Sequence, residues 1–412
     1  MIRGRHIICV ASNWDDHPTS KHHVMRRLAA ANDVLWVNYH ASRRPRLTRT
    51  DLRLAWRRLG HAVRPAGRVM PRLQVLSPLL VPLPASAVAR TVNTWLLRRH
   101  IAAALRRQPP RPIQLWLFTP DVPELIAALP AERVVYYCVD DFAGFAGFDA
   151  ALIEKLEALT VAQSDLVITT SGTLLERHRP RHSRVHLVPH GVDYEHFAAA
   201  VDLPREAVPP DVRGLPRPVF GYMGMISEYV DLELLAAAAR ARPDWSFVLL
   251  GDARRDVRVV AGLPNVHLLG GRPYEQLPAY CRGFDVGLIP FEMNRLVRAV
   301  NPIKLREYLA AGLPVVSAPM AAVRDYAPDV HTADTLPTFL KACEAAWRQA
   351  AAGNRRARQE RVHGEGWAAR VEWLSHLVEH LPPTPVGGGV EAAAATSGAG
   401  HALPSVQPGA IL

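Results

Sequence analysis

The stretch from Asn301 to Glu307 combines groups that could hold a phosphate and a pair of sugar hydroxyls. We expect Asn301 to cap a helix that has a proline in its first turn. The start of such a helix offers unpaired N–H groups and partial positive charge, which attract a phosphate. Lys304 and Arg298 could add full charge, and the Glu307 carboxylate could accept hydrogen bonds from a ribose diol. The segment therefore predicts a nucleotide site.

Carboxylates that could act as general bases follow two expected strands of the first half of the chain. Asp121 follows the strand at 114–118, and Asp140 and Asp141 follow the strand at 134–138. The adjacent pair could contain one carboxyl group with a raised pKa. It could equally be a helix cap with a solvated neighbour, and the sequence leaves both interpretations open.

A further polar group surrounds the first expected helix. Asp16 follows the strand at 6–11, and Lys21, His22 and His23 open the next helix. The two histidines do not predict a metal site, because no third ligand appears at a useful spacing. We expect these residues to serve a substrate at the edge of the first sheet, with His22 as a further candidate base.

These residues are placed by apolar runs that alternate with helical patterns, which is typical of a parallel α/β sheet. The first half contains expected strands at 6–11, 33–39, 74–76, 114–118, 134–138, 166–169 and 185–188. The pattern restarts after a Pro-rich stretch, with strands at 218–223, 246–250, 266–269, 285–289 and 314–317. The predicted fold class is α/β, with two Rossmann-like doubly wound domains that face each other across a cleft. Ligands in such sheets bind beyond the carboxyl ends of the strands.

The expected domain boundaries follow from the same pattern. We predict an N-terminal domain over 1–200, a linker over 201–217 and a C-terminal domain over 218–365. Residues 366–381 form an expected amphipathic helix that could cross back to the first domain. Residues 382–412 contain mostly Pro, Gly, Ala and Ser, which predicts a disordered tail.

Cysteine content and hydropathy favour a cytoplasmic location. The four cysteines, Cys9, Cys138, Cys281 and Cys343, are far apart, and none lies in a C-x-x-C pair. Neither a zinc site nor a disulfide framework is therefore expected. No stretch approaches the roughly 18 to 20 apolar residues that span a bilayer, and the first apolar run is too short for the core of a signal peptide.

Charge is concentrated in the first 120 residues, which contain 21 Lys and Arg against 4 Asp and Glu. This excess indicates an anionic partner, such as lipid headgroups or a phosphate-bearing acceptor. It could instead reflect an Arg-rich composition throughout the chain. Arg43–Arg72 and the helix expected at 87–107 mix Arg with Trp56 and Trp95, which favours peripheral contact with the inner face of the plasma membrane. No aromatic-rich recognition motif supports nucleic-acid binding, so we expect no such partner.

Several blocks resemble, in order, those of GT-B glycosyltransferases, especially glycosyltransferase family 4 and its polysaccharide-synthesis relatives. Glu307-Tyr-Leu-Ala-Ala-Gly-Leu-Pro-Val-Val316 is similar to the E-A-M-A-x-G-x-P-V-I pattern of that family. The blocks Ser164–Ser171, Val188–Asp193 and Phe220–Gly224 resemble three others. The resemblance is collinear from about residue 160 to 320.

This resemblance implies transfer of a sugar from an NDP-sugar, with UDP or GDP as the nucleotide and no required metal, to a polysaccharide, glycolipid or lipid-linked acceptor in cell-surface glycan synthesis. With the helix-start residues above, the expected donor-binding residues are Gly224, Arg295, Arg298, Asn301, Lys304 and Glu307. Asp16, Lys21 and His23 are the implied acceptor-binding residues. The catalytic candidates are His22, Asp121, Asp140 and Asp141.

The chain departs from the family pattern at two places. Ala299 replaces the first glutamate of the E-x7-E pair, and residues 224–230 lack the two cations that usually follow the glycine turn. We expect Arg295, Arg298 and Lys304 to neutralise the diphosphate instead. Two alternatives stay open: a nucleotide-sugar 2-epimerase on the same fold, and a catalytically inactive scaffold that binds nucleotide-sugars.

Overall fold

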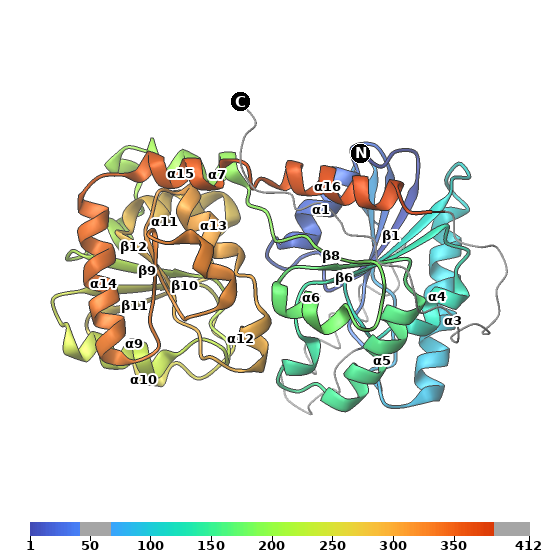
Figure 1. Cartoon of the computed structure of the whole chain (residues 1–412), viewed down its shortest axis with the longest axis horizontal. Helices are drawn as coiled ribbons and strands as arrows, with labels where there is room; N and C mark the ends of the chain where they lie inside the picture. Colours follow the sequence, from blue (N-terminus) through green and yellow to red (C-terminus); the bar gives the residue numbers. More distant parts are fainter. Residues whose placement is uncertain (42–66, 383–412) are drawn as a thin grey trace, which may run out of the picture. The chain divides into compact units, whose positions relative to one another are not determined.

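The computed structural model describes residues 1–41 and 67–382, and residues 1–381 form one compact unit. Two sheets, one of eight strands and one of six, make up its framework (Figure 1). The predicted pair of doubly wound α/β domains is confirmed. Two sequence predictions fall outside the described residues: the tail beyond residue 382, and the part of the basic region at 43–66 that contains Trp56.

The first sheet is parallel except at one edge. Its strand order is β3-β4-β2-β1-β5-β6-β7-β8, and only the β3–β4 pair is antiparallel. The strands are β1 (His6–Ala11), β2 (Asp33–Asn38), β3 (Gly67–Met70), β4 (Leu73–Leu76), β5 (Ile113–Leu117), β6 (Arg133–Cys138), β7 (Leu166–Thr169) and β8 (Val185–Leu187). No pattern in the sequence predicts β3.

Helices cover both faces of this sheet because its strands are apolar on both sides. They are α1 (Ser20–Leu28), α3 (Ala87–Leu105), α4 (Pro123–Ala128), α5 (Ala150–Gln163), α6 (Gly172–His178) and the short 3₁₀ turn η1 (Phe142–Gly144). Alternate residues of β1 show the two layers. Ile7 and Cys9 share a core with α1, and Ile8 and Val10 share one with α3, α4, α5 and α6.

The second sheet has six strands, with adjacent pairs parallel in the order β11-β10-β9-β12-β13-β14. They are β9 (Val219–Met223), β10 (Ser246–Leu250), β11 (Val266–Gly270), β12 (Val286–Ile289), β13 (Val315–Ser317) and β14 (Val330–Thr332). The helices are α7 (Tyr194–Ala198), α8 (Pro210–Arg213), α9 (Leu232–Ala241), α10 (Arg258–Ala261), α11 (Leu277–Gly283), α12 (Arg295–Ala299), α13 (Ile303–Ala310), α14 (Leu336–Ala351), α15 (Arg355–His363) and α16 (Trp367–Glu379). Four 3₁₀ turns complete this half: η2 (Ala199–Val201), η3 (Arg205–Ala207), η4 (Tyr274–Gln276) and η5 (Ala321–Tyr326).

The stretch expected to be a linker is packed rather than extended in solvent. It contains η3 and α8, and the buried Val208 and Val212 belong to the core of the second sheet. Both valines lie so close to Gly283 that a β-carbon there would be 2.8 Å from each of them. The apolar positions of 201–217 therefore attach this segment to the C-terminal domain.

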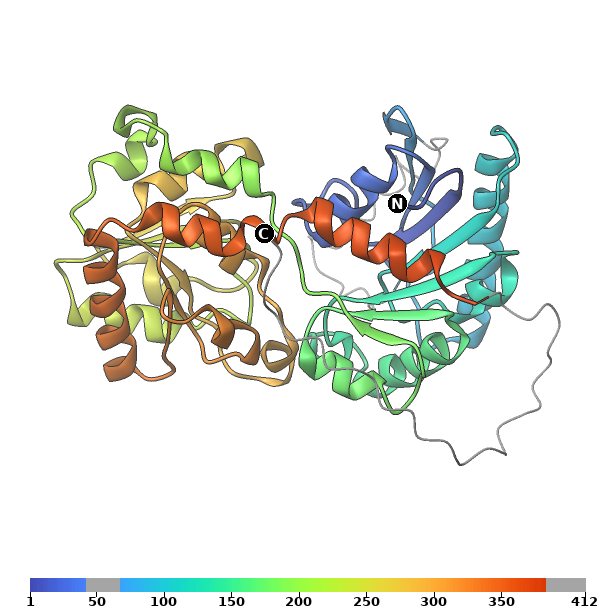
Figure 2. The same cartoon turned by 45° about the horizontal axis from the view of Figure 1, so that its top comes forward.

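The last helix, α16, returns to the first domain. Its Trp367 is buried and stacks on His23 of α1, with ring centroids 5.2 Å apart and an interplanar angle of 3°. Val371, Leu374 and Val378 join the same core, and α16 lies beside α1 in both views (Figure 1, Figure 2). Burial of this apolar stripe is what holds α16 to the first domain.

Two hydrogen bonds join the turn after β7 to the segment that leads into α13. The Ser171 hydroxyl donates to the Ala299 carbonyl at 2.7 Å, and the Asn301 amide donates to the Thr170 carbonyl at 2.8 Å. The start of α13 is thus fixed against the carboxyl end of a strand of the first domain.

Candidate functional site

Helix α13 begins at Ile303, and its N-cap position is Pro302. The expectation that Asn301 caps the helix is wrong. The Asn301 side chain is buried. Its Oδ1 accepts a hydrogen bond from Arg306 Nη1 at 2.7 Å, and its Nδ2 donates one to the Thr170 carbonyl. Pro302 provides no side-chain cap hydrogen bond, and Leu305 N–H donates to the Pro302 carbonyl, so the N–H groups of Ile303 and Lys304 are the ones available to an anion.

Lys304 brings an ammonium group to the turn that follows β9. A β-carbon on Gly224 would lie 3.0 Å from Lys304 Nζ, and this nitrogen donates to the Tyr222 hydroxyl at 3.3 Å. Burial lowers the pKa of Lys304 to about 8, although nearby Glu307 favours the charged form. A cation from α13 therefore lies at the glycine turn, where the sequence of the turn itself provides none.

The conformation of this turn requires glycine. Gly224 has a φ of +136°, and Gly251 at the end of β10 has a φ of +153°. A β-carbon on Gly251 would lie 2.0 Å from the Gly224 carbonyl oxygen. The two backbones approach each other as closely as only glycine allows. Because Gly224 has no side chain, the Lys304 side chain has space above the turn.

Glu307 lies about one helical turn beyond Lys304 on the same helix and is half-buried. Burial raises the pKa of Glu307 to about 7, while Lys304 lowers it and Asp193 raises it. Among the residues that the structure describes, no hydrogen bond or ion pair uses this carboxylate. A half-buried carboxylate without a hydrogen-bond partner is suited to accept one from a ligand hydroxyl.

Tyr274, in η4 after β11, was not singled out from the sequence. Its ring stacks on His196 with centroids 4.5 Å apart and meets His17 of the first domain edge-on at 5.7 Å. The Tyr274 hydroxyl is buried and has no hydrogen-bond partner in the described part of the chain. Burial raises the pKa of Tyr274, and Glu307 contributes. No motif marks this residue, because its importance depends on tertiary contacts alone.

Arg295, which the sequence predicts to neutralise a diphosphate, forms ion pairs in the structure. Arg295 Nε lies 2.7 Å from Asp141 Oδ2, and its Nη2 lies 2.6 Å from Glu154 Oε1. Arg295 is thus engaged by two carboxylates of the first domain. Arg298 is exposed on α12, and its backbone carbonyl accepts from Thr173 at 3.1 Å. Of the three proposed cations, the structure places Lys304 at the glycine turn.

The adjacent carboxylates after β6 have different environments. Asp141 is fully buried, and Arg177 Nη2 lies 2.6 Å from its Oδ2. Burial opposes ionisation, but hydrogen bonds from Arg177 and Arg295 hold the pKa of Asp141 below its usual value. Asp141 occupies the N-cap position of η1 without making a cap hydrogen bond. Its role is that of an ion-pair centre between the two domains.

Asp140 matches the interpretation of a carboxyl group with a raised pKa. Burial raises the pKa of Asp140 to about 7, and Asp141 adds to this effect, while Lys21 opposes it. Tyr229 of the second domain also lies within electrostatic reach. Burial raises the pKa of Tyr229, and the charge of Asp140 raises it further. Asp140 therefore faces groups from both domains.

Lys21 and Asp16 lie on the same side of the first sheet as Asp140. Lys21 is half-buried on α1, and burial lowers its pKa, while Asp140 and then Asp16 favour its charged form. Asp16 is exposed in the loop after β1. These three residues form a group of alternating charge within electrostatic reach of one another.

The two histidines of α1 are structural. His22 Nδ1 accepts a hydrogen bond from the Thr19 N–H at 3.1 Å, and His22 Nε2 lies 3.2 Å from the Trp14 carbonyl. Burial lowers the pKa of both His22 and His23 to about 3. With both ring nitrogens engaged, His22 is not free to act as a base, and His23 is covered by Trp367 rather than open to an acceptor.

Asp121 is buried at the end of β5. The Thr119 hydroxyl donates to its carboxylate, and its backbone carbonyl accepts from the Tyr39 hydroxyl at 3.5 Å. These contacts fix the turn after the strand. The structure therefore brings Asp140, Lys21 and Asp16 together and assigns Asp121 to the packing of the first domain.

Comparison with known proteins shows what this chain and its fold are similar to. Residues 217–337 match the family model described as "Glycosyl transferases group 1". Sucrose-phosphate synthase from Thermosynechococcus elongatus superposes with a TM-score of 0.65 over 92% of this chain and 99% of that one, at 15% identity. HepE of Anabaena, solved in complex with UDP-glucose, superposes with a TM-score of 0.63 over 91% of this chain and all of that one (100%), at 13% identity. The fold is GT-B.

A curated relative extends the similarity at the sequence level. TuaH of Bacillus subtilis, provisionally named a teichuronic acid biosynthesis glycosyltransferase, is 29% identical over 254 residues. The alignment covers 56% of this chain and 62% of TuaH, less than two thirds of its length. The predicted resemblance to GT-B glycosyltransferases is thus confirmed, and the group 1 domain lies in the half of the chain that contains Gly224, Lys304 and Glu307.

Proposed function

We propose that this protein transfers a sugar from an NDP-sugar to a hydroxyl group of a growing glycan. The observation that carries the proposal is that the Lys304 ammonium, over the Gly224 turn, lies on the same helix as Glu307, whose carboxylate has no hydrogen-bond partner in the described structure. The diphosphate binds between the start of α13, Lys304 and the Gly224 turn. The ribose diol donates its hydrogen bonds to Glu307.

The nucleotide of the donor is UDP or GDP, and the complex of HepE with UDP-glucose supports UDP. The leaving diphosphate is stabilised by an ammonium and by helix N–H groups. These groups supply the positive charge that a metal ion would otherwise provide, so we propose that transfer requires no metal.

The acceptor binds on the side of the first domain, against Asp140 and Lys21. Asp140 is placed to accept a hydrogen bond from the acceptor hydroxyl and so to orient it towards the donor. Lys21 keeps positive charge beside that carboxylate. The similarity to TuaH supports a polysaccharide or lipid-linked acceptor for cell-surface glycan synthesis.

A face of α3 suits contact with an anionic membrane, which a lipid-linked acceptor would require. Val88, Val92 and Trp95 share one side of the helix and are 74%, 40% and 55% exposed, an unusual stripe for a surface in water. Arg99 follows on the same side and lies over the Trp95 ring at 5.4 Å. None of the helices in residues 1–41 and 67–382 is both long and apolar enough to cross a bilayer, so we propose peripheral contact through α3.

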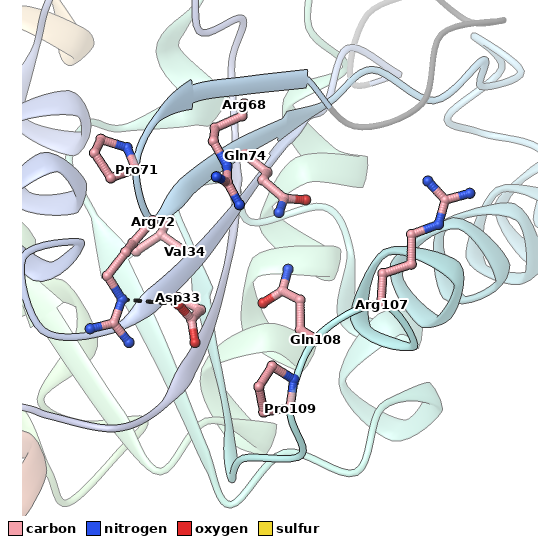
Figure 3. Close-up of a pocket in the computed structure, with 9 residues that line it drawn as sticks. All are labelled: Asp33, Val34, Arg68, Pro71, Arg72, Gln74, Arg107, Gln108 and Pro109. Carbon is pink, nitrogen blue, oxygen red and sulfur yellow. Dashed lines mark hydrogen bonds and ion pairs between the residues drawn. The ribbon is translucent and has the colours of Figure 1, made fainter.

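A basic pocket lies near the end of this helix and could receive a lipid phosphate. Figure 3 shows Arg68, Arg72 and Arg107 among the residues that line it, with Asp33 beside Arg72. Arg72 Nε is held by Asp33 Oδ1 at 3.0 Å, which leaves Arg68 and Arg107 as the more available cations. The apolar stripe and the pocket together fit a headgroup-bearing surface.

The activity is tested by incubating the protein with radiolabelled UDP- and GDP-sugars, with and without lipid extract from the source cells. We expect label to enter a lipid-extractable product, with nucleoside diphosphate released only when acceptor is present. Lys304→Met should abolish transfer, and Lys341→Met, which removes an exposed lysine of α14, should not. Acceptor-independent change of the sugar would indicate an epimerase, and nucleotide binding without turnover would indicate a scaffold; either result overturns the proposal.

A further inference from the structure

Three potential metal ligands meet in the interior of the first domain, away from the donor site. Cys138 comes from the end of β6, Glu157 from α5 and His178 from the end of α6. Their ligand atoms all lie within 4.8 Å of one another, and all three residues are almost fully buried, at 0%, 2% and 0% exposure in that order. Separate elements of the chain thus place sulfur, oxygen and nitrogen ligands around one point.

The hydrogen bonding of this cluster is incomplete. Neither ring nitrogen of His178 has a hydrogen-bond partner in the described residues, although the ring is fully buried. His178 Nε2 and Cys138 Sγ each lie 3.8 Å from Glu157 Oε1, so the imidazole is too far away for a hydrogen bond and the thiol makes only a weak one. Leaving polar groups buried without partners is costly, and such groups commonly contact an ion or water.

We propose that Cys138, Glu157 and His178 bind a zinc ion that holds β6, α5 and α6 together. Thiolate, imidazole and carboxylate groups are each ligands of zinc in proteins. Tetrahedral zinc would need these ligand atoms to be about 3.3–3.6 Å apart. Glu157 Oε1 lies 3.8 Å from each of the other two ligand atoms, and all three atoms lie within 4.8 Å of one another, so binding requires the ligands to move closer together. Binding replaces the thiol proton, which leaves to solvent, and involves no redox change.

The surrounding residues support this arrangement. The Tyr136 hydroxyl donates to Glu157 Oε1 at 2.7 Å and would orient the carboxylate as an outer-shell partner. The charge of Arg177 is met by Asp141 at 2.6 Å.

The ion would be structural, because the cluster is sealed from solvent. Its position still matters for the acceptor side. Cys138 is two residues before Asp140, and His178 directly follows Arg177, the partner of Asp141. A zinc ion bound to Cys138 and His178 would therefore also hold the loop after β6 and the ion pair between Asp141 and Arg177 in place.

Metal content and a cobalt spectrum test the proposal on the full-length protein, and neither depends on transferase activity. Protein purified without chelator should contain about one zinc per chain by elemental mass spectrometry. Cys138→Ser and His178→Gln should lose it, whereas Cys281→Ser, which changes a buried cysteine of α11, should retain it. After zinc removal, added Co²⁺ should give a thiolate-to-cobalt absorption band in the wild type and not in Cys138→Ser.

If the cluster variants fail to fold, the cobalt spectrum of the wild type decides. A wild-type protein that contains no zinc and gives no thiolate band with cobalt overturns the proposal. So does a metal content that is unchanged in folded Cys138→Ser and His178→Gln.

Discussion

The ammonium group of Lys304 occupies the space that a side chain at Gly224 would need: a β-carbon there would lie 3.0 Å from Nζ and 3.2 Å from Cε. The glycine and the lysine are 80 positions apart in the sequence, and the fold makes them one unit. Gly224→Ala should therefore displace the lysine as well as strain a backbone whose φ is +136°. We expect UDP affinity to fall about tenfold or more, and stability to fall by about 1–3 kcal/mol, as measured by calorimetry and thermal unfolding.

Gly214→Ala is the matched control, because nothing lies within 4 Å of a β-carbon at that position and its φ is −92°. It should bind UDP as the wild type does. Unchanged UDP affinity in Gly224→Ala would show that the turn does not contact the diphosphate.

The pKa values of Glu307 and Lys304 predict a bell-shaped pH dependence of UDP binding. Glu307 has a pKa of about 7 in the free protein, so its ionised form, which accepts the ribose hydrogen bonds, increases as the pH rises towards 7. Lys304 has a pKa of about 8, so the cation that holds the diphosphate is lost above that pH. Affinity should therefore be highest between pH 7 and 8, as measured by titration calorimetry.

Uridine separates the two limbs of this profile, because it has the ribose and lacks the diphosphate. Its affinity should still rise towards pH 7 and should not fall above pH 8 through loss of the Lys304 charge. A UDP profile without an alkaline decline would mean that Lys304 does not contact the phosphates.

The two adjacent aspartates should respond differently to the same substitution. Asp141→Asn removes a fully buried charge from Arg177 and Arg295, which lie 2.6 and 2.7 Å away. Breaking a buried pair costs about 3–5 kcal/mol, and the partial exposure of the two arginines reduces this to about 2–3 kcal/mol. Thermal unfolding should show the loss.

Asp140→Asn should leave the unfolding temperature close to that of the wild type and reduce turnover at saturating donor. Equal turnover in Asp140→Asn and the wild type would remove this residue from the acceptor side. Unchanged stability in Asp141→Asn would show that the contact between the domains is not maintained in solution.

How far the sequence predicts this molecule depends on whether the relevant interaction is local. The strand around Val219–Met223 and the helix that contains Glu307 follow from apolar runs and from proline and glycine at their ends, and both were predicted. The antiparallel β3 was missed, because its four residues are partly exposed and carry no alternating pattern.

The site shows the same division. The sequence singles out Gly224 and Glu307 through blocks with a recognisable order and Lys304 through its place at the start of a helix, and the structure brings Lys304 to Gly224. Arg295 pairs with Asp141, 154 residues away, and no local pattern in the sequence predicts that contact. Asn301 was taken for a cap because a local rule favours it, and the tertiary contact with Thr170 overrode that rule.

Membrane contact through α3 predicts that Trp95→Glu weakens binding to anionic vesicles. The tryptophan is 55% exposed within the apolar stripe, so a carboxylate there opposes both insertion and headgroup attraction. Sedimentation with phosphatidylglycerol vesicles should show a several-fold lower bound fraction. Trp347→Glu, at a tryptophan of α14 that is 37% exposed, is the control and should bind normally. Equal sedimentation of the Trp95 variant and the wild type would contradict contact through this face.

The most direct test of the donor site is thermal stabilisation by UDP and GDP, measured on the wild type, Glu307→Gln and Glu233→Gln. Ligand that binds only the folded state raises the unfolding temperature according to its affinity. Glu233 is an exposed residue of α9 and serves as the matched control. We predict that UDP or GDP stabilises the wild type and Glu233→Gln equally, and that Glu307→Gln loses most of the shift. Equal stabilisation of all three proteins, or of none, would contradict the assignment of the nucleotide to α13.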